Sequence, residues 1–334
     1  MCNCMKKIII AIFLLITGSS VFAMENVKPV DLINGYTIYR NLQDALKNTD
    51  NVYSLDLSKQ NLKSLPASIK ELKNLRILKI SYNKLIVLPD EICELSNLER
   101  LDASNNELVS IPEKIGQLSK LNKLFLFRNK IKSLPISITD LKELIILAVY
   151  KNQIEEIPAG IGNLSKLEEL YLNINKIINI PSELYKLENL KILDLSYNSI
   201  TYISDNLNYF KNLEKLDLSY NKLNYFPTSI SGLINLKELV LLNSNITNVP
   251  ENIGDLQNLE NLNLAFNNIR KLPESIGNLK ALMSLDLTRS EIKNLPDTMR
   301  NLLNLKFVTL SMNTFENSVK SKIQSTLPKA QIFW

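Results

Sequence analysis

The 334-residue chain contains no histidine, and this absence removes much of the chemistry that enzymes use near neutral pH. Histidine is the usual general base and the commonest metal ligand at that pH. Ser/His and Cys/His pairs, which activate nucleophiles, cannot be formed without it. The sequence offers no other nucleophile with a base beside it, and no cluster of metal ligands. We therefore predict a non-enzymatic protein with no catalytic residues, no metal site and no cofactor.

Cysteine is scarce, and two of the three cysteines, Cys2 and Cys4, lie in an N-terminal segment that we expect to be removed. The remaining Cys93 then has no partner for an internal disulfide. A lone cysteine among apolar residues is usually a small buried side chain, so we interpret Cys93 as unreactive.

Long apolar runs are also missing, since the most apolar segment extends only from Ile8 to Ile16. That is about half of the roughly 20 residues that a transmembrane helix needs. Two lysines precede the run, and an acceptable cleavage site ending at Ala23 follows it, which is typical of a secretory signal peptide. A membrane anchor is the alternative. The sequence predicts a signal peptide over residues 1–23, no membrane span, and export to the periplasm, the cell surface or the medium.

The net charge is small, with 39 basic against 34 acidic residues. Removal of Lys6 and Lys7 with the signal peptide leaves an excess of three basic residues. Such an excess does not by itself indicate a nucleic-acid partner, and we predict none.

A 23-residue repeat dominates the rest of the chain. Segments of the form L-x-L-x-x-N-x-L, such as the one from Leu78 to Leu85, recur without any insertion. The Asn position of the twelve units falls at Gln60, Asn83, Asn106, Asn129, Asn152, Asn175, Asn198, Asn221, Ser244, Asn267, Ser290 and Asn313. A repeat of this length indicates a solenoid in which neighbouring units share one core.

Each unit also contains the pattern P-x-x-I-x-x-L-x-x-L, and ten of the twelve prolines occupy its first position. Ser204 is the only replacement. The alternation in L-x-L predicts a short strand with one buried face, and parallel strands need a crossover, which the remaining residues supply. Proline suits the first turn of a short helix in that crossover.

These motifs resemble those of the leucine-rich repeat family, in the 23-residue subclass with L-P-x-x-I after the Asn segment. Plant intracellular proteins of the Ras-binding type and many bacterial exported proteins share this subclass. The resemblance implies an α/β solenoid, a horseshoe with a concave parallel sheet and short helices or turns on the convex side. Exported animal members usually carry disulfide-bonded caps, so their absence favours a bacterial exported protein.

The domain boundaries follow from the repeat. We predict a signal peptide at 1–23, an N-terminal cap at 24–51, the repeat array at 52–313 and a C-terminal cap at 314–334. In the C-terminal cap we expect a helix that buries Ile323 and Leu327, followed by a segment that closes the sheet edge, with Trp334 as an apolar lid. We expect a monomer.

The Asn column has a structural explanation. An Asn side chain offers two donors and an acceptor, enough to satisfy backbone groups where each strand turns inward. We assign this structural ladder to Asn83, Asn106, Asn129, Asn152, Asn175, Asn198, Asn221, Asn267 and Asn313.

Aromatic residues gather on the expected concave face in units 4 to 6, whereas other units carry a plain Asp-Ser pair such as Asp194 and Ser196. Neighbouring strands lie about 4.8 Å apart, which would bring these rings into one exposed patch. Aromatics beside arginine are typical of protein-binding hot spots. The alternative is that the rings only pack against each other. The predicted partner-binding residues are Phe125, Phe127, Arg128, Tyr150, Lys151, Tyr171 and Ile174.

Charged residues are unevenly distributed along the same face, which predicts a surface that is positive at one end and negative at the other. The alternative is that these residues are ordinary solvated surface side chains. Units 2 to 6 carry Lys79, Lys84, Arg100, Lys123, Arg128, Lys130, Lys151 and Lys176 against Asp102, Glu107 and Glu169. Units 7 to 11 carry Asp194, Asp217, Glu238, Asp286 and Glu291 against Lys215, Lys222 and Arg289.

We interpret the chain as an exported scaffold whose concave face engages a protein of a host or of the cell envelope. The alternative is an adhesin-like protein that binds a glycan or another surface polymer. An enzyme such as the bacterial ubiquitin ligases with these repeats would need a further catalytic domain with a reactive cysteine, and only 21 residues follow Asn313.

Overall fold

The computed structural model describes residues 37–334. The predicted signal peptide at 1–23 and the first part of the predicted N-terminal cap lie outside these residues. Chain contacts divide the protein into a unit Met1–Ile38 and a unit Tyr39–Trp334, and the fold described below is that of the second unit.

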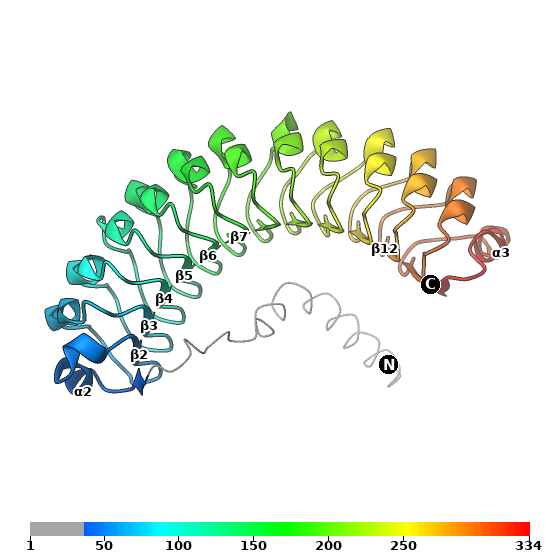
Figure 1. The fold of residues 1–334 in the computed structure, drawn as a ribbon. Coiled ribbons are helices and arrows are strands. Elements are labelled where there is room, and N and C mark those ends of the chain that lie inside the picture. The colour runs from blue at the N-terminus through cyan, green and yellow to red at the C-terminus, as the bar shows by residue number, and fades with distance from the viewer. Residues whose placement is uncertain (1–36) are drawn as a thin grey trace, which may run out of the picture. The chain divides into compact units, whose positions relative to one another are not determined.

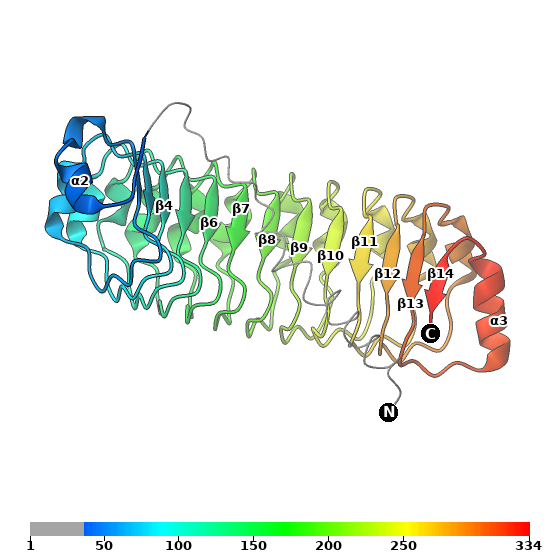
Figure 2. The same cartoon turned by 90° about the horizontal axis from the view of Figure 1, so that it is seen from below.

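A single sheet of 14 strands runs through the protein, and its strands follow one another in sequence order (Figure 2). All pairs from β2 to β14 are parallel. The strands are β1 (Ile38–Tyr39), β2 (Ser54–Asp56), β3 (Ile77–Lys79), β4 (Arg100–Asp102), β5 (Lys123–Phe125), β6 (Ile146–Ala148), β7 (Glu169–Tyr171), β8 (Ile192–Asp194), β9 (Lys215–Asp217), β10 (Glu238–Val240), β11 (Asn261–Asn263), β12 (Ser284–Asp286), β13 (Phe307–Thr309) and β14 (Gln331–Phe333).

The register of the sheet repeats the 23-residue spacing of the sequence, as in the pairs Leu55 with Leu78 and Leu124 with Leu147. The central leucine of each strand from β2 to β12 is buried, because alternate side chains of a strand point to opposite faces. Leucine and isoleucine from every unit join one continuous core. The predicted leucine-rich-repeat horseshoe is confirmed: the strands line the inner side of an arc and the crossovers lie on its outer side (Figure 1).

The crossovers contain 3-10 helices, mostly of five residues, in place of α-helical turns. Proline takes the N-cap position just before the first helical residue, as Pro66 and Pro273 do. The helices are Thr49–Asn51, Ala67–Glu71, Asp90–Glu94, Ile115–Gln117, Ile136–Asp140, Ala159–Asn163, Ser182–Lys186, Asp205–Tyr209, Thr228–Gly232, Glu251–Asp255, Glu274–Asn278 and Asp297–Asn301. A 3-10 helix rises more per residue than an α-helix, so five residues suffice to cross the convex side.

Helical elements flank the array at both ends. Near the N-terminus, α2 (Leu42–Leu46) is capped by Asn41, whose side chain accepts hydrogen bonds from two backbone N–H groups of the first turn. At the other end, α3 (Asn317–Thr326) precedes β14, which pairs with β13. Ile323 and Leu327 are buried, as predicted from the sequence. Trp334 meets Phe315 edge-on, with ring centroids 5.6 Å apart.

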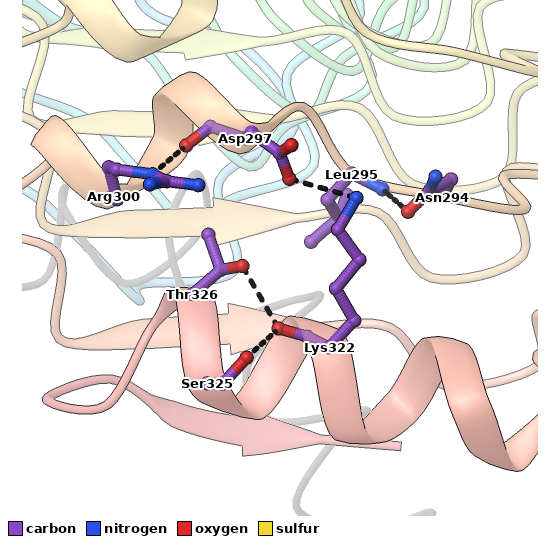
Figure 3. A network of polar contacts seen from close by, with 7 residues as sticks. All are labelled: Asn294, Leu295, Asp297, Arg300, Lys322, Ser325 and Thr326. Atoms are coloured by element: carbon purple, nitrogen blue, oxygen red, sulfur yellow. Dashed lines mark hydrogen bonds and ion pairs between the residues drawn. The ribbon is translucent and has the colours of Figure 1, made fainter.

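An ion pair joins α3 to the last crossover: Lys322 Nζ lies 2.9 Å from Asp297 Oδ1 (Figure 3). This contact lowers the pKa of Asp297, because the ammonium donates a hydrogen bond to the carboxylate. Arg300 Nε donates to the backbone oxygen of Asp297 (2.9 Å), so both basic side chains meet at one residue.

A second ladder of asparagines, which the sequence reasoning missed, runs along the crossovers. Each side-chain Nδ2 donates to the carbonyl oxygen 24 residues earlier, at 2.8–2.9 Å. Its members are Asn74, Asn97, Asn189, Asn212, Asn235, Asn258 and Asn304. Their spacing in multiples of 23 residues was a signal that could have revealed them.

Candidate partner-binding surface

The first Asn ladder bonds the end of each strand to the neighbouring units. Asn152 Nδ2 donates to the oxygens of Leu126 (3.0 Å) and Val149 (2.9 Å), and its Oδ1 accepts from the N–H of Ile131 (3.1 Å). The other eight predicted members make the equivalent bonds. Ser244 reproduces part of this pattern, since its hydroxyl donates to Leu218 O (2.9 Å). These are the bonds that a structural role requires.

The sheet register brings the predicted aromatic residues together on the concave face. Phe125 of β5, Ala148 of β6 and Tyr171 of β7 lie side by side in one row. Two residues further along, the rings of Phe127 and Tyr150 stack with centroids 4.5 Å apart and an interplanar angle of 6°. Both rings are half-buried.

Two exposed cations follow the stacked rings directly. Arg128 and Lys151 have left-handed backbones, with φ of 56° and 54°, as does the half-buried Ile174 on the next unit with φ of 55°. Short polar or glycine residues usually occupy this conformation, so larger side chains here carry a small backbone cost. Phe127, Tyr150, Arg128 and Lys151 thus form one accessible cluster, which we call the ring cluster.

The prediction that all four aromatic rings are exposed is wrong for Phe125 and Tyr171, which are 8% and 9% exposed. The Arg100 guanidinium lies over the Phe125 ring, 4.9 Å from its centroid. Tyr171 donates its hydroxyl hydrogen to Glu169 Oε2 (3.0 Å), and burial raises the pKa of Tyr171. These two rings offer little area to a partner.

Two of the carboxylates counted in the predicted bipolar charge, those of units 7 and 8, are buried. Asp194 and Asp217 are 2% and 3% exposed. Each Oδ1 accepts both the N–H and the hydroxyl of the serine two residues later, at 2.6–3.0 Å. Ser196 and Ser219 are therefore buried hydrogen-bond donors rather than generic surface filling. Lys215 pairs with Glu238 at 3.0 Å, so one acidic and one basic group of this half neutralise each other.

A second stacked pair, Tyr197 and Tyr220, was missed by the sequence reasoning. Their ring centroids are 4.1 Å apart, and Tyr197 is 42% exposed. Both residues precede a ladder Asn, as Arg128 and Lys151 do, so the repeat alignment contained the signal.

Within residues 37–334, no group of three or more Cys, Asp or Glu side chains could hold a metal ion, and no helix is long and apolar enough to cross a membrane. Cys93 is 3% exposed, and burial followed by the charge of Asp90 raises the pKa of its thiol to about 11. At neutral pH the thiol is protonated, which agrees with the unreactive role predicted for it.

Sequence profiles decide the family. The profile of the leucine-rich repeat region matches residues 101–218 and 200–327, and a second leucine-rich repeat profile matches residues 50–108. The chain belongs to the leucine-rich repeat family. Proteins of this family commonly serve as protein-binding scaffolds. No curated protein sequence matches the chain.

Solved leucine-rich repeat structures share the fold. A leucine-rich repeat protein of Leptospira interrogans is 29% identical, with a TM-score of 0.70, and the match covers 89% of this chain and 100% of that one. An internalin of Listeria monocytogenes, InlF, is 22% identical, with a TM-score of 0.69 and coverage of 86% and 88%. The plant peptide hormone receptor RGFR1, solved in complex with RGF2, is 27% identical, with a TM-score of 0.54 and coverage of 78% and 51%.

Proposed function

We propose that the protein is an exported, non-enzymatic scaffold of the bacterial 23-residue subclass, and that it binds a partner protein through the ring cluster on its concave face. The observation that carries this proposal is the accessible stack of Phe127 and Tyr150 beside the exposed Arg128 and Lys151. Large rigid rings and arginine are the side chains that most often dominate protein-binding energy.

The stacking geometry favours a protein partner over the glycan of the alternative hypothesis. Sugars bind aromatic side chains by lying flat on a ring face, and the stack covers one of the two faces of both Phe127 and Tyr150, at an interplanar angle of 6°. Both rings are partly exposed, and the adjacent cations Arg128 and Lys151 are exposed. Edges carry the positive part of the aromatic quadrupole and suit backbone carbonyls and carboxylates of a protein.

Export rests on the signal peptide predicted over residues 1–23. The plant peptide hormone receptor RGFR1 has the same fold and was solved in complex with RGF2, which supports a binding role for this chain. The partner is proposed to be a protein of a host or of the cell envelope, bound by a monomer.

Paired substitutions test the proposal. Proteins captured by residues 24–334 from surface and extracellular extracts would be purified, and their affinities measured for the parent and for the Phe127→Ser/Tyr150→Ser variant. We expect the variant to lose roughly 2 kcal/mol or more, about 30-fold in affinity. Tyr202→Ser is the control, because Tyr202 is 56% exposed on the segment between β8 and the next crossover helix. Equal affinities of parent and double variant would refute the ring cluster as the binding site.

A further inference from the structure

A hollow of about 1140 Å³ lies at the carboxyl ends of strands β8 to β13, away from the ring cluster. Residues that follow each of these six strands line it, and an adjoining hollow of about 700 Å³ shares Asn268, Arg270 and Glu291 with it. We call the two together the C-terminal groove. Strands β8 to β13 stand side by side in one half of the sheet (Figure 2).

Positive charge dominates the wall of the C-terminal groove. Four cationic side chains line the larger hollow, and Glu291 is the acidic residue among them. Arg270 Nε lies 3.6 Å from Glu291 Oε2, so this pair offsets one cation. The cations are Lys222, Arg270, Arg289 and Lys293.

Amide side chains and two aromatic rings complete the lining. Asn243, Asn245 and Asn268 are exposed, and each amide can both donate to and accept from a peptide backbone. Phe266 is half-buried, and the Arg289 guanidinium lies over its ring, 5.7 Å from the centroid. This contact holds the guanidinium over the groove, which lowers the entropy that it would lose on binding a carboxylate.

The backbone of the C-terminal groove departs from the regular repeat at two units. Ser244 and Ser290 replace the ladder Asn there, and the residues that follow them, Asn245 and Glu291, have left-handed backbones with φ of 61° and 57°. Both of these residues line the groove. Two of the six units that line the groove are therefore units in which serine replaces the ladder Asn.

From these observations we propose that the C-terminal groove binds an extended acidic peptide segment of a partner protein. Six strands about 4.8 Å apart span roughly 24 Å, which at about 3.3 Å per residue corresponds to roughly seven residues of extended chain. Carboxylates of the segment pair with Arg289, Lys222 and Lys293, and its backbone bonds to the exposed amides. Glu291 stands among the cations, so a segment with spaced charges fits better than a densely charged polyanion such as a sulfated glycan.

This site is separate from the ring cluster and does not depend on it. The C-terminal groove is proposed to bind the carboxylates and the backbone of a peptide, whereas the ring cluster presents aromatic rings. The two can therefore be removed independently by substitution.

Selection from a displayed library of random heptapeptides tests the proposal. Residues 24–334 would select binders, and we expect Asp and Glu to be enriched over the starting library. The best peptide should bind the Arg289→Ser/Lys222→Ser variant at least tenfold more weakly, with an unchanged unfolding midpoint because both side chains are on the surface. Lys186→Ser is the matched control, since Lys186 is an exposed cation on a convex-side helix.

The selected peptide and the two double variants distinguish binding in the C-terminal groove from binding at the ring cluster and from polyanion binding. Unchanged binding to the Phe127→Ser/Tyr150→Ser variant keeps this site distinct from the proposed function, whereas a parallel loss places the peptide on the ring cluster and overturns the inference. Absence of acidic enrichment also overturns it. Tighter binding of a sulfated oligosaccharide than of the selected peptide, lost in the Arg289→Ser/Lys222→Ser variant, would show that the groove takes a polyanion instead.

Discussion

At the scale of single residues, the buried carboxylates of the concave face have the largest electrostatic consequences. Asp194 and Asp217 are register neighbours on β8 and β9. Burial, followed by the charge of Asp217, raises the pKa of Asp194 to about 7, and burial likewise raises the pKa of Asp217. Hydrogen bonds from Ser196 and Ser219 oppose these shifts but do not cancel them.

The raised pKa values predict a protein that becomes less stable as pH rises. Below pH about 4 these carboxyls are protonated in both the folded and the unfolded chain, so their ionisation costs nothing. As pH rises from about 4 to about 7 the unfolded chain is ionised while the folded chain stays largely protonated, so stability falls over this range and levels off above it. We expect the parent to lose on the order of 2 kcal/mol between pH 5 and 8.5, and Asp194→Asn to lose less.

Urea unfolding at the two pH values measures this difference. Asparagine should be tolerated, because Asn263 occupies the same row on β11 and its Oδ1 accepts the same N–H bond, from Ala265 at 3.0 Å. If the unfolding free energies of the parent and of Asp194→Asn depended on pH in the same way, the loss of stability could not be assigned to Asp194.

Ser204, the one exception to the proline column, has a structural reason that only the three-dimensional contacts reveal. Its backbone N–H donates to the hydroxyl of Tyr185 (3.1 Å), which is 4% exposed and packs against Phe210 with centroids 5.4 Å apart. Proline has no N–H group and could not make this bond.

Ser204→Pro should therefore destabilise the protein even though ten other units carry proline at this position. We expect a loss of about 1–3 kcal/mol, the cost of leaving a buried hydroxyl without its partner. Tyr185→Phe should cost a similar amount, while the double variant should cost less than the sum of the two. Urea midpoints of all four proteins provide the measurement, and simple additivity would show that the two groups are not coupled.

At the scale of elements, the sequence predicted the strands, the first Asn ladder and the C-terminal helix because each repeats a local pattern. Exposure of the rings could not be predicted in the same way. Phe125 and Phe127 lie on the same face, yet only Phe125 is covered, because Arg100 of the neighbouring unit lies over it. Such coverage depends on side-chain conformation across strands, which a repeat alignment does not contain. The groove was missed for the same reason.

The first Asn ladder predicts that different substitutions of Asn152, in the turn after β6, destabilise the protein to different degrees. Asn152→Ala should destabilise by about 1–3 kcal/mol, since Leu126 O, Val149 O and the Ile131 N–H each lose a hydrogen-bond partner. Asn152→Ser should cost less, because Ser244 shows that a hydroxyl can still donate to a carbonyl of the ladder. Equal urea midpoints for the alanine and serine variants would contradict this order.

At the scale of the whole molecule, stability is a sum over units and their interfaces, because each repeat contacts only its neighbours. The last unit has no further repeat to cover it, and α3 with β14 takes that place. Ile323 of α3 is 2% exposed and belongs to the hydrophobic core of the array. The ion pair of Lys322 with Asp297 lies at the surface beside it, with both side chains about half exposed (Figure 3).

Two adjacent substitutions separate these contributions to the cap. Ile323→Ser should destabilise by roughly 2–4 kcal/mol, because it leaves a cavity and buries a hydroxyl beneath α3. Lys322→Ala should leave the unfolding midpoint close to that of the parent, since exposed ion pairs contribute little. Near-equal effects would mean that charge rather than burial holds the cap. Because units are coupled only to their neighbours, Ile323→Ser should also make amide hydrogens of β13 exchange faster while those of β5 and β6 keep their protection.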